Sequence, residues 1–186
     1  MASRSGLNNF ALVSHGSGRG SLRRRGGAAK VAASTGRGAA VPDIIIRRLA
    51  PGDRDRWAGL WDGYNVFYKR TVEDRVTRRL WSSLLDEDRE PYGFGVECDG
   101  ELAGFAHYFF VYSTSDWSPR CYLQDLYADA ALRGRGLGRA LIEAVYAEAD
   151  RHEASQTYWL TQEFNDTARR LYDRVATATP FIKYQR

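Results

Sequence analysis

The sequence predicts an α/β fold, a mixed β-sheet with helices packed on both of its faces. Two observations lead to this prediction. Strand and helix periodicities follow one another from residue 41 onward in the order β-α-α-β-β-β-α-β-α-β. A turn rich in glycine and arginine, residues 133–139, connects the fourth strand to the third helix. At 186 residues and 44% hydrophobic composition, the chain is long enough for one domain with a substantial core.

The charges divide the chain into a basic tail, residues 1–40, and a domain, residues 41–186. The tail holds seven basic residues and no acidic one, whereas the domain holds the other 20 basic residues against 23 acidic ones, a net charge of −3. We expect a disordered tail, with an organelle transit peptide or a polyanion-binding arm as alternatives. An acidic domain favours a cationic substrate and argues against nucleic acid.

Location and membrane association follow from the same composition. No run of about 18 apolar residues is present, so we expect no membrane span. We expect a cytoplasmic protein, with a nuclear location or, if the tail is a transit peptide, import into an organelle as alternatives.

The first half of the domain reads as a strand and two helices. Residues 44–46 form an isoleucine strand that ends before Pro51, and Asp53 or Asp55 can cap the helix after it. The apolar face of this first helix is Trp57, Leu60, Trp61, Tyr64 and Phe67. Thr71 and Asp74 resemble a capping box that begins a second helix. Its expected apolar face is Val72, Val76, Leu80 and Leu84.

A β-hairpin follows, with residues 93–98 and 102–112 joined by the turn Asp99-Gly100. Cys98 and Cys121 lie in expected strands, which predicts two buried free thiols. With no CxxC motif and three histidines, we expect no metal site.

The second half is expected to contain a central strand up to residue 128, a long helix to about His152, a strand at residues 157–162, a helix from Asn165 or Asp166, and a last strand at residues 181–184 that closes the sheet.

The turn at residues 133–139 has the chemistry of a pyrophosphate site. Gly134, Gly136 and Gly138 allow a tight bend that points several backbone N–H groups at one place. The following helix N-terminus adds partial positive charge, and three arginines, at positions 133, 135 and 139, surround the turn. A P-loop is excluded because its lysine and hydroxyl residue are missing, and the glycines do not follow the GxGxxG dinucleotide pattern.

Arg133, Gly136 and Gly138 instead fit the pattern [Q/R]xxGx[G/A], which resembles the coenzyme A loop of the GCN5-related N-acetyltransferase (GNAT) superfamily. Downstream, Asn165, Ala168 and the pair Leu171-Tyr172 resemble its second signature. The segments YLQDLYADAALRGRGLG, YWLTQEFN, ARRLYDRV and FIKY are similar to the yeast-type histone and D-amino-acid N-acetyltransferases. The related polyamine acetyltransferases typically show Glu-Asp where this chain has Gln124-Asp125.

The resemblance implies acetyl transfer from acetyl-CoA directly to a primary amine of a histone tail, a polyamine or an amino acid, with both substrates bound together. It implies that the fourth strand splays from the fifth, that Asn165 contacts the pantetheine arm, and that the Tyr172 hydroxyl protonates the leaving thiolate. It also implies a homodimer, for which residues 181–184 offer an edge. The cofactor-binding residues it implies are Leu126, Tyr127 and Ala128, one of which supplies an N–H to the oxyanion, and Arg133, Gly134, Arg135, Gly136, Leu137, Gly138, Arg139, Asn165 and Tyr172.

The general base is left open between Asp125, Glu163 and a water or backbone route. Both carboxylates, with Gln124 and Trp117, are also candidates for binding the substrate. Strict alternation along a strand places Gln124 and Asp125 on opposite faces, so that only one of them faces the cleft.

Three aromatic residues, Trp117, Tyr112 and Trp61, can either line the acceptor pocket or pack in the core, and His107 is expected to be structural. Two other functions remain as alternatives: a non-catalytic acyl-CoA-binding or scaffold domain, and a nucleic-acid binder that uses the tail.

Overall fold

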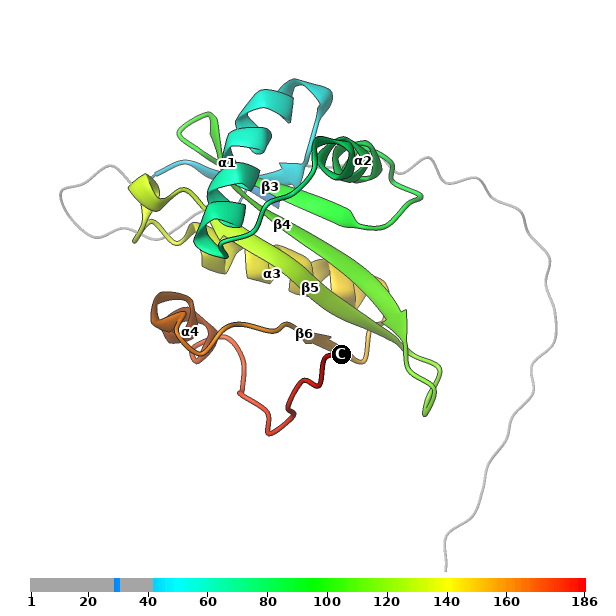
Figure 1. Ribbon diagram of the computed structural model, residues 1–186. Helices are drawn as coiled ribbons and strands as arrows, with labels where there is room; N and C mark the ends of the chain where they lie inside the picture. The colour runs from blue at the N-terminus through cyan, green and yellow to red at the C-terminus, as the bar shows by residue number, and fades with distance from the viewer. Residues whose placement is uncertain (1–28, 31–41) are drawn as a thin grey trace, which may run out of the picture.

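The computed structural model describes residues 29–30 and 42–186, which form a single sheet with helices on both faces (Figure 1). The six strands lie side by side in chain order, antiparallel except for the last pair, which is parallel. They are β1 (Ala29–Lys30), β2 (Ile44–Arg48), β3 (Tyr92–Cys98), β4 (Glu101–Tyr112), β5 (Pro119–Ala128) and β6 (Gln156–Tyr158). The predicted fold class is therefore confirmed. Most of the expected tail lies outside the described residues, and Ala29 and Lys30 pair with β2.

The helices form two layers, one on each face of the sheet. Helices α1 (Arg54–Phe67) and α2 (Asp74–Leu84) cover one face, and α3 (Leu137–Arg151) covers the other (Figure 1). Trp57 of α1 and Leu141 of α3 are completely buried, one in each layer. Burying a large apolar side chain contributes roughly 1.5–3 kcal/mol, so both layers stabilise the sheet between them.

The apolar face of α1 matches the prediction except at Phe67, which is 42% exposed. On α2, Leu84 is buried and Leu80, with Val72 just before the helix, packs against the same core, as predicted. Val76 is 48% exposed, whereas Trp81 is buried and packs against Trp57 with ring centroids 4.9 Å apart. The expected capping box is also wrong, because α2 begins at Asp74 after Glu73 and no side chain caps it. The buried face of α2 is therefore the predicted one, shifted to include the indole ring of Trp81 and to leave out Val76.

The hairpin of β3 and β4 forms as predicted. Asp99 and Gly100 both have positive φ, 56° and 88°, as the tight two-residue turn of such a hairpin requires. Cys98 and, on β5, Cys121 are buried free thiols, as expected.

A β-bulge interrupts β5 at Gln124. His107 of β4 pairs with Asp125 and Tyr108 pairs with Leu123, so Gln124 has no partner on β4. Leu123 and Leu126 consequently both pack into the core on the α3 side, although three positions separate them. The expected strict alternation of Gln124 and Asp125 is therefore wrong, because the extra residue shifts the pleat.

The sheet opens at its C-terminal edge. β6 pairs with β5 only at Arg120, Cys121 and Tyr122, while β5 continues to Ala128. The expected strand to residue 162 therefore ends at Tyr158, and the two strands separate. Beyond the gap lies α4 (Asp166–Tyr172), which Asn165 precedes as N-cap residue.

The predicted last strand, residues 181–184, does not form. No residue from 176 to 186 is in a helix or strand, and Phe181 and Tyr184 are 90% and 87% exposed. The three-residue β6 offers few backbone groups for another strand of the same chain to pair with. Among the described residues, no helix combines the length and apolar character needed to cross a bilayer.

Candidate active site

A cavity of about 570 Å³ lies where β6 separates from β5. It is bordered by the end of β5, the turn before α3, the C-terminal end of α1 and the helix α4. Of the residues implied by the resemblance to bind the cofactor, all but one line it: Leu126, Tyr127, Ala128, Arg133, Gly134, Gly136, Leu137, Gly138, Arg139, Asn165 and Tyr172.

At one end of the cavity, the Gly/Arg turn presents the N-terminus of α3. Gly134 and Gly136 have φ of 80° and 85°, a conformation that only glycine adopts readily. Gly138 serves differently, because a Cβ there would lie 3.1 Å from Leu171 Cδ2, so its absence lets α4 approach α3. The first two glycines shape the turn, and the third brings α4 to the cavity.

The charge at this end suits a polyanion. Arg133, Arg139 and Arg174 line the cavity against one carboxylate, Asp166. Together with the partial positive charge of the α3 N-terminus, these guanidinium groups fit the pyrophosphate of a nucleotide-type cofactor.

Arg135 is the exception among the expected cofactor residues. It does not border the cavity; its guanidinium donates to Asp99 at 2.7 Å and contacts the Cys98 sulfur at 3.4 Å. Its side chain therefore ties the turn to the β3–β4 hairpin instead of facing the cofactor site.

The middle of the cavity is formed by the unpaired edge of β5. Within the described strands, β6 leaves β5 after Tyr122, so backbone groups of residues 126–128 at that edge have no strand beside them. Such groups can donate to a carbonyl oxygen that gains negative charge.

Helix α4 contributes Asn165 and Tyr172, seven residues apart and both on the cavity side. Tyr172 packs edge-on against Trp159 with ring centroids 5.2 Å apart. Burial, with a smaller contribution from nearby Tyr68, raises the pKa of Tyr172 to about 12. Its hydroxyl therefore keeps its proton at neutral pH and is available as a donor.

The other end of the cavity is aromatic, and sequence reasoning did not assign it to the site. It is lined by Tyr64, Phe67, Tyr68 and Phe164. A neighbouring hollow of about 440 Å³ shares the last three of these and adds Lys69 and Gln162. The signal in the sequence was an excess of aromatic residues at the end of α1, directly followed by two cations, Lys69 and Arg70.

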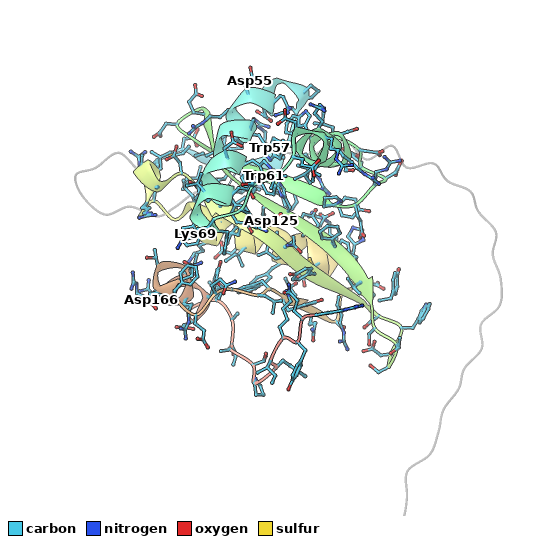
Figure 2. The ribbon with its side chains drawn as sticks, viewed as in Figure 1. Asp55, Trp57, Trp61, Lys69, Asp125 and Asp166 are labelled. Carbon is cyan, nitrogen blue, oxygen red and sulfur yellow. The ribbon has the colours of Figure 1, made fainter. Side chains whose placement is uncertain are left out.

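Asp125 is buried beneath this aromatic end and does not border the cavity. Tyr64 donates to one carboxylate oxygen at 2.7 Å, and the other lies 3.1 Å from His107 Nδ1. Burial alone would raise the pKa of Asp125, but these hydrogen bonds and nearby positive charge outweigh it and hold the pKa below its ordinary value. Asp125 is therefore an ionised group enclosed by its partners. Figure 2 shows Asp125 on β5 beside the helix α1, which carries Trp57 and Trp61.

The remaining expected substrate residues lie outside the cavity. Gln124 is exposed in the bulge, and Glu163 is exposed beside the cavity residue Phe164. Trp117, 75% exposed, packs on Tyr112 at the far end of the β4–β5 hairpin. Trp61 belongs to the core on the α1 side. The structure thus does not bring these side chains together with Tyr172.

Burial raises the pKa of Cys121 to about 12, which suppresses the thiolate a nucleophile requires. Within residues 29–30 and 42–186, no group of three or more His, Cys, Asp or Glu side chains is placed to hold a metal ion.

Comparison with known proteins agrees with this geometry. Residues 57–176 match the model of the acetyltransferase (GNAT) family. The D-amino-acid N-acetyltransferase HPA3 of Saccharomyces cerevisiae is 32% identical over 146 residues, which are 77% of this chain and 90% of that protein.

Two solved structures share the fold. The ribosomal-protein-alanine N-acetyltransferase of Brucella melitensis biovar Abortus 2308 aligns with a TM-score of 0.65 at 22% identity, over 76% of this chain and 96% of that one. The aminoglycoside N-acetyltransferase AAC(6')-Iy, solved in complex with CoA, aligns with a TM-score of 0.67 at 20% identity, over 82% and 98%. The chain belongs to the GNAT family and is an acetyl-CoA-dependent N-acetyltransferase.

Proposed function

We propose that the protein transfers the acetyl group of acetyl-CoA directly to the primary amine of a small molecule while both substrates are bound. One observation carries this proposal: a single cavity joins the anion-binding turn before α3 to an aromatic end on α1, with Tyr172 on its wall. The buried Cys121, whose thiol pKa is raised, does not support an acyl-enzyme route.

Different residues of the cavity bind the cofactor, stabilise the carbonyl oxygen and protonate the leaving sulfur. The backbone of the Gly/Arg turn, Arg133 and Arg139 hold the pyrophosphate, and Asn165 contacts the pantetheine arm. A backbone N–H of residues 126–128 stabilises the carbonyl oxygen, an effect worth roughly 3 kcal/mol in such sites. Bound acetyl-CoA supplies an activated thioester, and the Tyr172 hydroxyl gives a proton to the sulfur as it leaves.

For the acceptor, we propose an amino acid in preference to a polyamine or a histone tail. Lys69 borders the hollow next to the aromatic end of the cavity, and the Arg70 guanidinium lies 5.1 Å and 5.0 Å from the rings of Tyr64 and Tyr68. Two cations here favour a substrate that carries a carboxylate as well as an amine. The relative named as a D-amino-acid N-acetyltransferase supports the same substrate class.

The acceptor amine must also lose a proton during the transfer. Neither Asp125 nor Glu163 borders the cavity, so we propose that water in the open cavity, rather than direct contact with a carboxylate, carries the proton away.

We further propose a homodimer. Phe181, Ile182 and Tyr184 are exposed at the end of the chain, and a second copy can cover them. Light scattering coupled to size-exclusion chromatography tests this, and a monomer at micromolar concentration contradicts it.

The acetyl-transfer proposal is tested by measuring CoA thiol release with a panel of amines: D- and L-amino acids, their amides, spermidine and a histone-tail peptide. We expect turnover with amino acids. Mass spectrometry should show a product about 42 Da heavier than the amine, because acetylation replaces one hydrogen of the amine with an acetyl group. Thiol release without an acetylated amine would contradict transfer, and preference for spermidine would contradict the proposed acceptor class.

A further inference from the structure

A chain of buried hydrogen bonds connects the core to the cavity. The Trp57 indole N–H donates to His107 Nε2 at 3.2 Å, His107 Nδ1 lies 3.1 Å from Asp125, and Tyr64 donates to the other Asp125 oxygen at 2.7 Å. Trp57 and His107 are completely buried, and Asp125 nearly so. Of these four side chains, Tyr64 is the one that borders the cavity.

The chemistry of the donors fixes the direction of every hydrogen in this chain. An indole can only donate, so His107 Nε2 accepts and the ring hydrogen sits on Nδ1, from which it is donated to Asp125. The ionised carboxylate can only accept. Tyr64 must therefore donate its single hydroxyl hydrogen to Asp125.

The hydroxyl of Tyr64 is consequently an acceptor toward any further partner. Its ring is held in place by Trp61, Tyr68 and Phe105, with centroid distances of 5.5, 5.0 and 6.0 Å. A fixed hydroxyl oxygen on a residue that borders the cavity suits an N–H donor, and an amine is such a donor. The neighbouring Arg70 guanidinium is also an N–H donor and already interacts with the Tyr64 hydroxyl, which confirms the accepting role of this oxygen.

We propose that the Tyr64 hydroxyl oxygen accepts a hydrogen bond from the amine of the acetyl acceptor, and that Asp125 is the positioning residue that holds this hydroxyl in its acceptor orientation. This rests on the proposed function, since it presumes an amine acceptor in the cavity. The nearby Arg70 guanidinium, 5.1 Å from the Tyr64 ring, favours the neutral amine that can attack a thioester over the charged ammonium.

The roles of the two residues are separated by Tyr64→Phe and Asp125→Asn. The first keeps the packed ring and removes the oxygen. In the second, His107 still donates from Nδ1 because Trp57 occupies Nε2, so the amide oxygen faces His107 and the amide NH₂ faces Tyr64. That NH₂ then donates to Tyr64, and the hydroxyl hydrogen turns toward the cavity.

The experiment measures kcat and KM for the amine at saturating acetyl-CoA, together with the Kd of acetyl-CoA by calorimetry. For Tyr64→Phe, kcat/KM for the amine is expected to fall about 10- to 100-fold, the usual consequence of losing one hydrogen bond to the substrate, with the Kd of acetyl-CoA unchanged. Asp125→Asn is expected to show a similar loss. In the double variant, Asp125→Asn should add no further loss, because the oxygen it positions is already gone.

Tyr92→Phe on β3 is the matched control, because it removes a hydroxyl outside the cavity and should leave all constants unchanged. Additive losses of kcat/KM in the double variant would show that Asp125 is structural and would overturn the proposal. An Asp125→Asn variant that unfolds at a lower temperature but keeps its amine kinetics would overturn it as well. Unchanged amine kinetics or weakened acetyl-CoA binding in Tyr64→Phe would also overturn it. If Tyr64→Phe fails to fold, Asp125→Asn alone decides through its effect on amine kinetics. Wild-type protein that acetylates no amine overturns the proposed function itself, and this inference with it.

Discussion

Replacing Tyr172 with phenylalanine tests the assignment of the general acid. Phenylalanine keeps the edge-on packing against Trp159, at 5.2 Å, and removes only the hydroxyl. General acid catalysis contributes typically 10²- to 10⁴-fold. Because the pKa of Tyr172 is raised to about 12, the hydroxyl is fully protonated at the pH of an assay, and its whole contribution is lost in the variant. We expect kcat to fall at least about 100-fold, which corresponds to about 2.7 kcal/mol.

The assay is steady-state CoA thiol release, combined with calorimetric titration of acetyl-CoA. Because the hydroxyl acts on the leaving sulfur, the Kd of acetyl-CoA should change by less than about threefold, which is under 0.7 kcal/mol. Tyr158→Phe is the matched control, since its ring stacks on Tyr122 at 5.0 Å outside the cavity. A kcat within about twofold of wild type would refute the role of Tyr172.

Three further predictions concern stability and the acceptor. Gly59→Ala in α1 should raise the free energy of unfolding by about 0.5–1 kcal/mol, because nothing lies within 4 Å of the added Cβ, whereas Gly63→Ala should lose this gain, because its Cβ would lie 2.6 Å from the Tyr127 hydroxyl. Urea denaturation measures both. Arg70→Gln should lower kcat/KM for amino acids about tenfold but not for their amides, if Arg70 binds the carboxylate; equal losses would exclude that role. The folded-state pKa of Cys121 is raised to about 12 from 9.0, so its stabilising contribution is complete below pH 9 and disappears as the pH rises toward 12. Unfolding curves between pH 8 and 11 should show this fall, and Cys121→Ser should flatten it.

Sequence periodicity and local dihedral requirements correctly located most of the elements. The tight glycine turn before α3, the hairpin turn at Asp99-Gly100 and the buried face of α1 apart from Phe67 were predicted. Each depends on residues within one turn or one helix, where backbone sterics and side-chain spacing act directly. For the same reason the cofactor end of the cavity, formed by one contiguous turn and one short helix, was also predicted.

The acceptor end depended on contacts between distant segments. The bulge at Gln124 follows from how β4 and β5 pair, and it placed Asp125 against α1. The hydrogen bonds that Asp125 accepts from Tyr64 and His107 span 61 and 18 residues. Arg135, expected at the cofactor, instead pairs with Asp99, 36 residues away.

The sequence by itself determined the order of strands and helices and the pyrophosphate chemistry of the Gly/Arg turn, because glycine conformations and helical repeats are properties of neighbouring residues. The resemblance of this turn and of Asn165 and Tyr172 to the GNAT signatures identified the cofactor. Only the tertiary structure decided three features of the site: which carboxylate is buried, which arginines face the cavity, and where β6 separates from β5. In each case several side chains or strands can contact the same partner, and the packing between elements far apart in sequence selects the contact that forms.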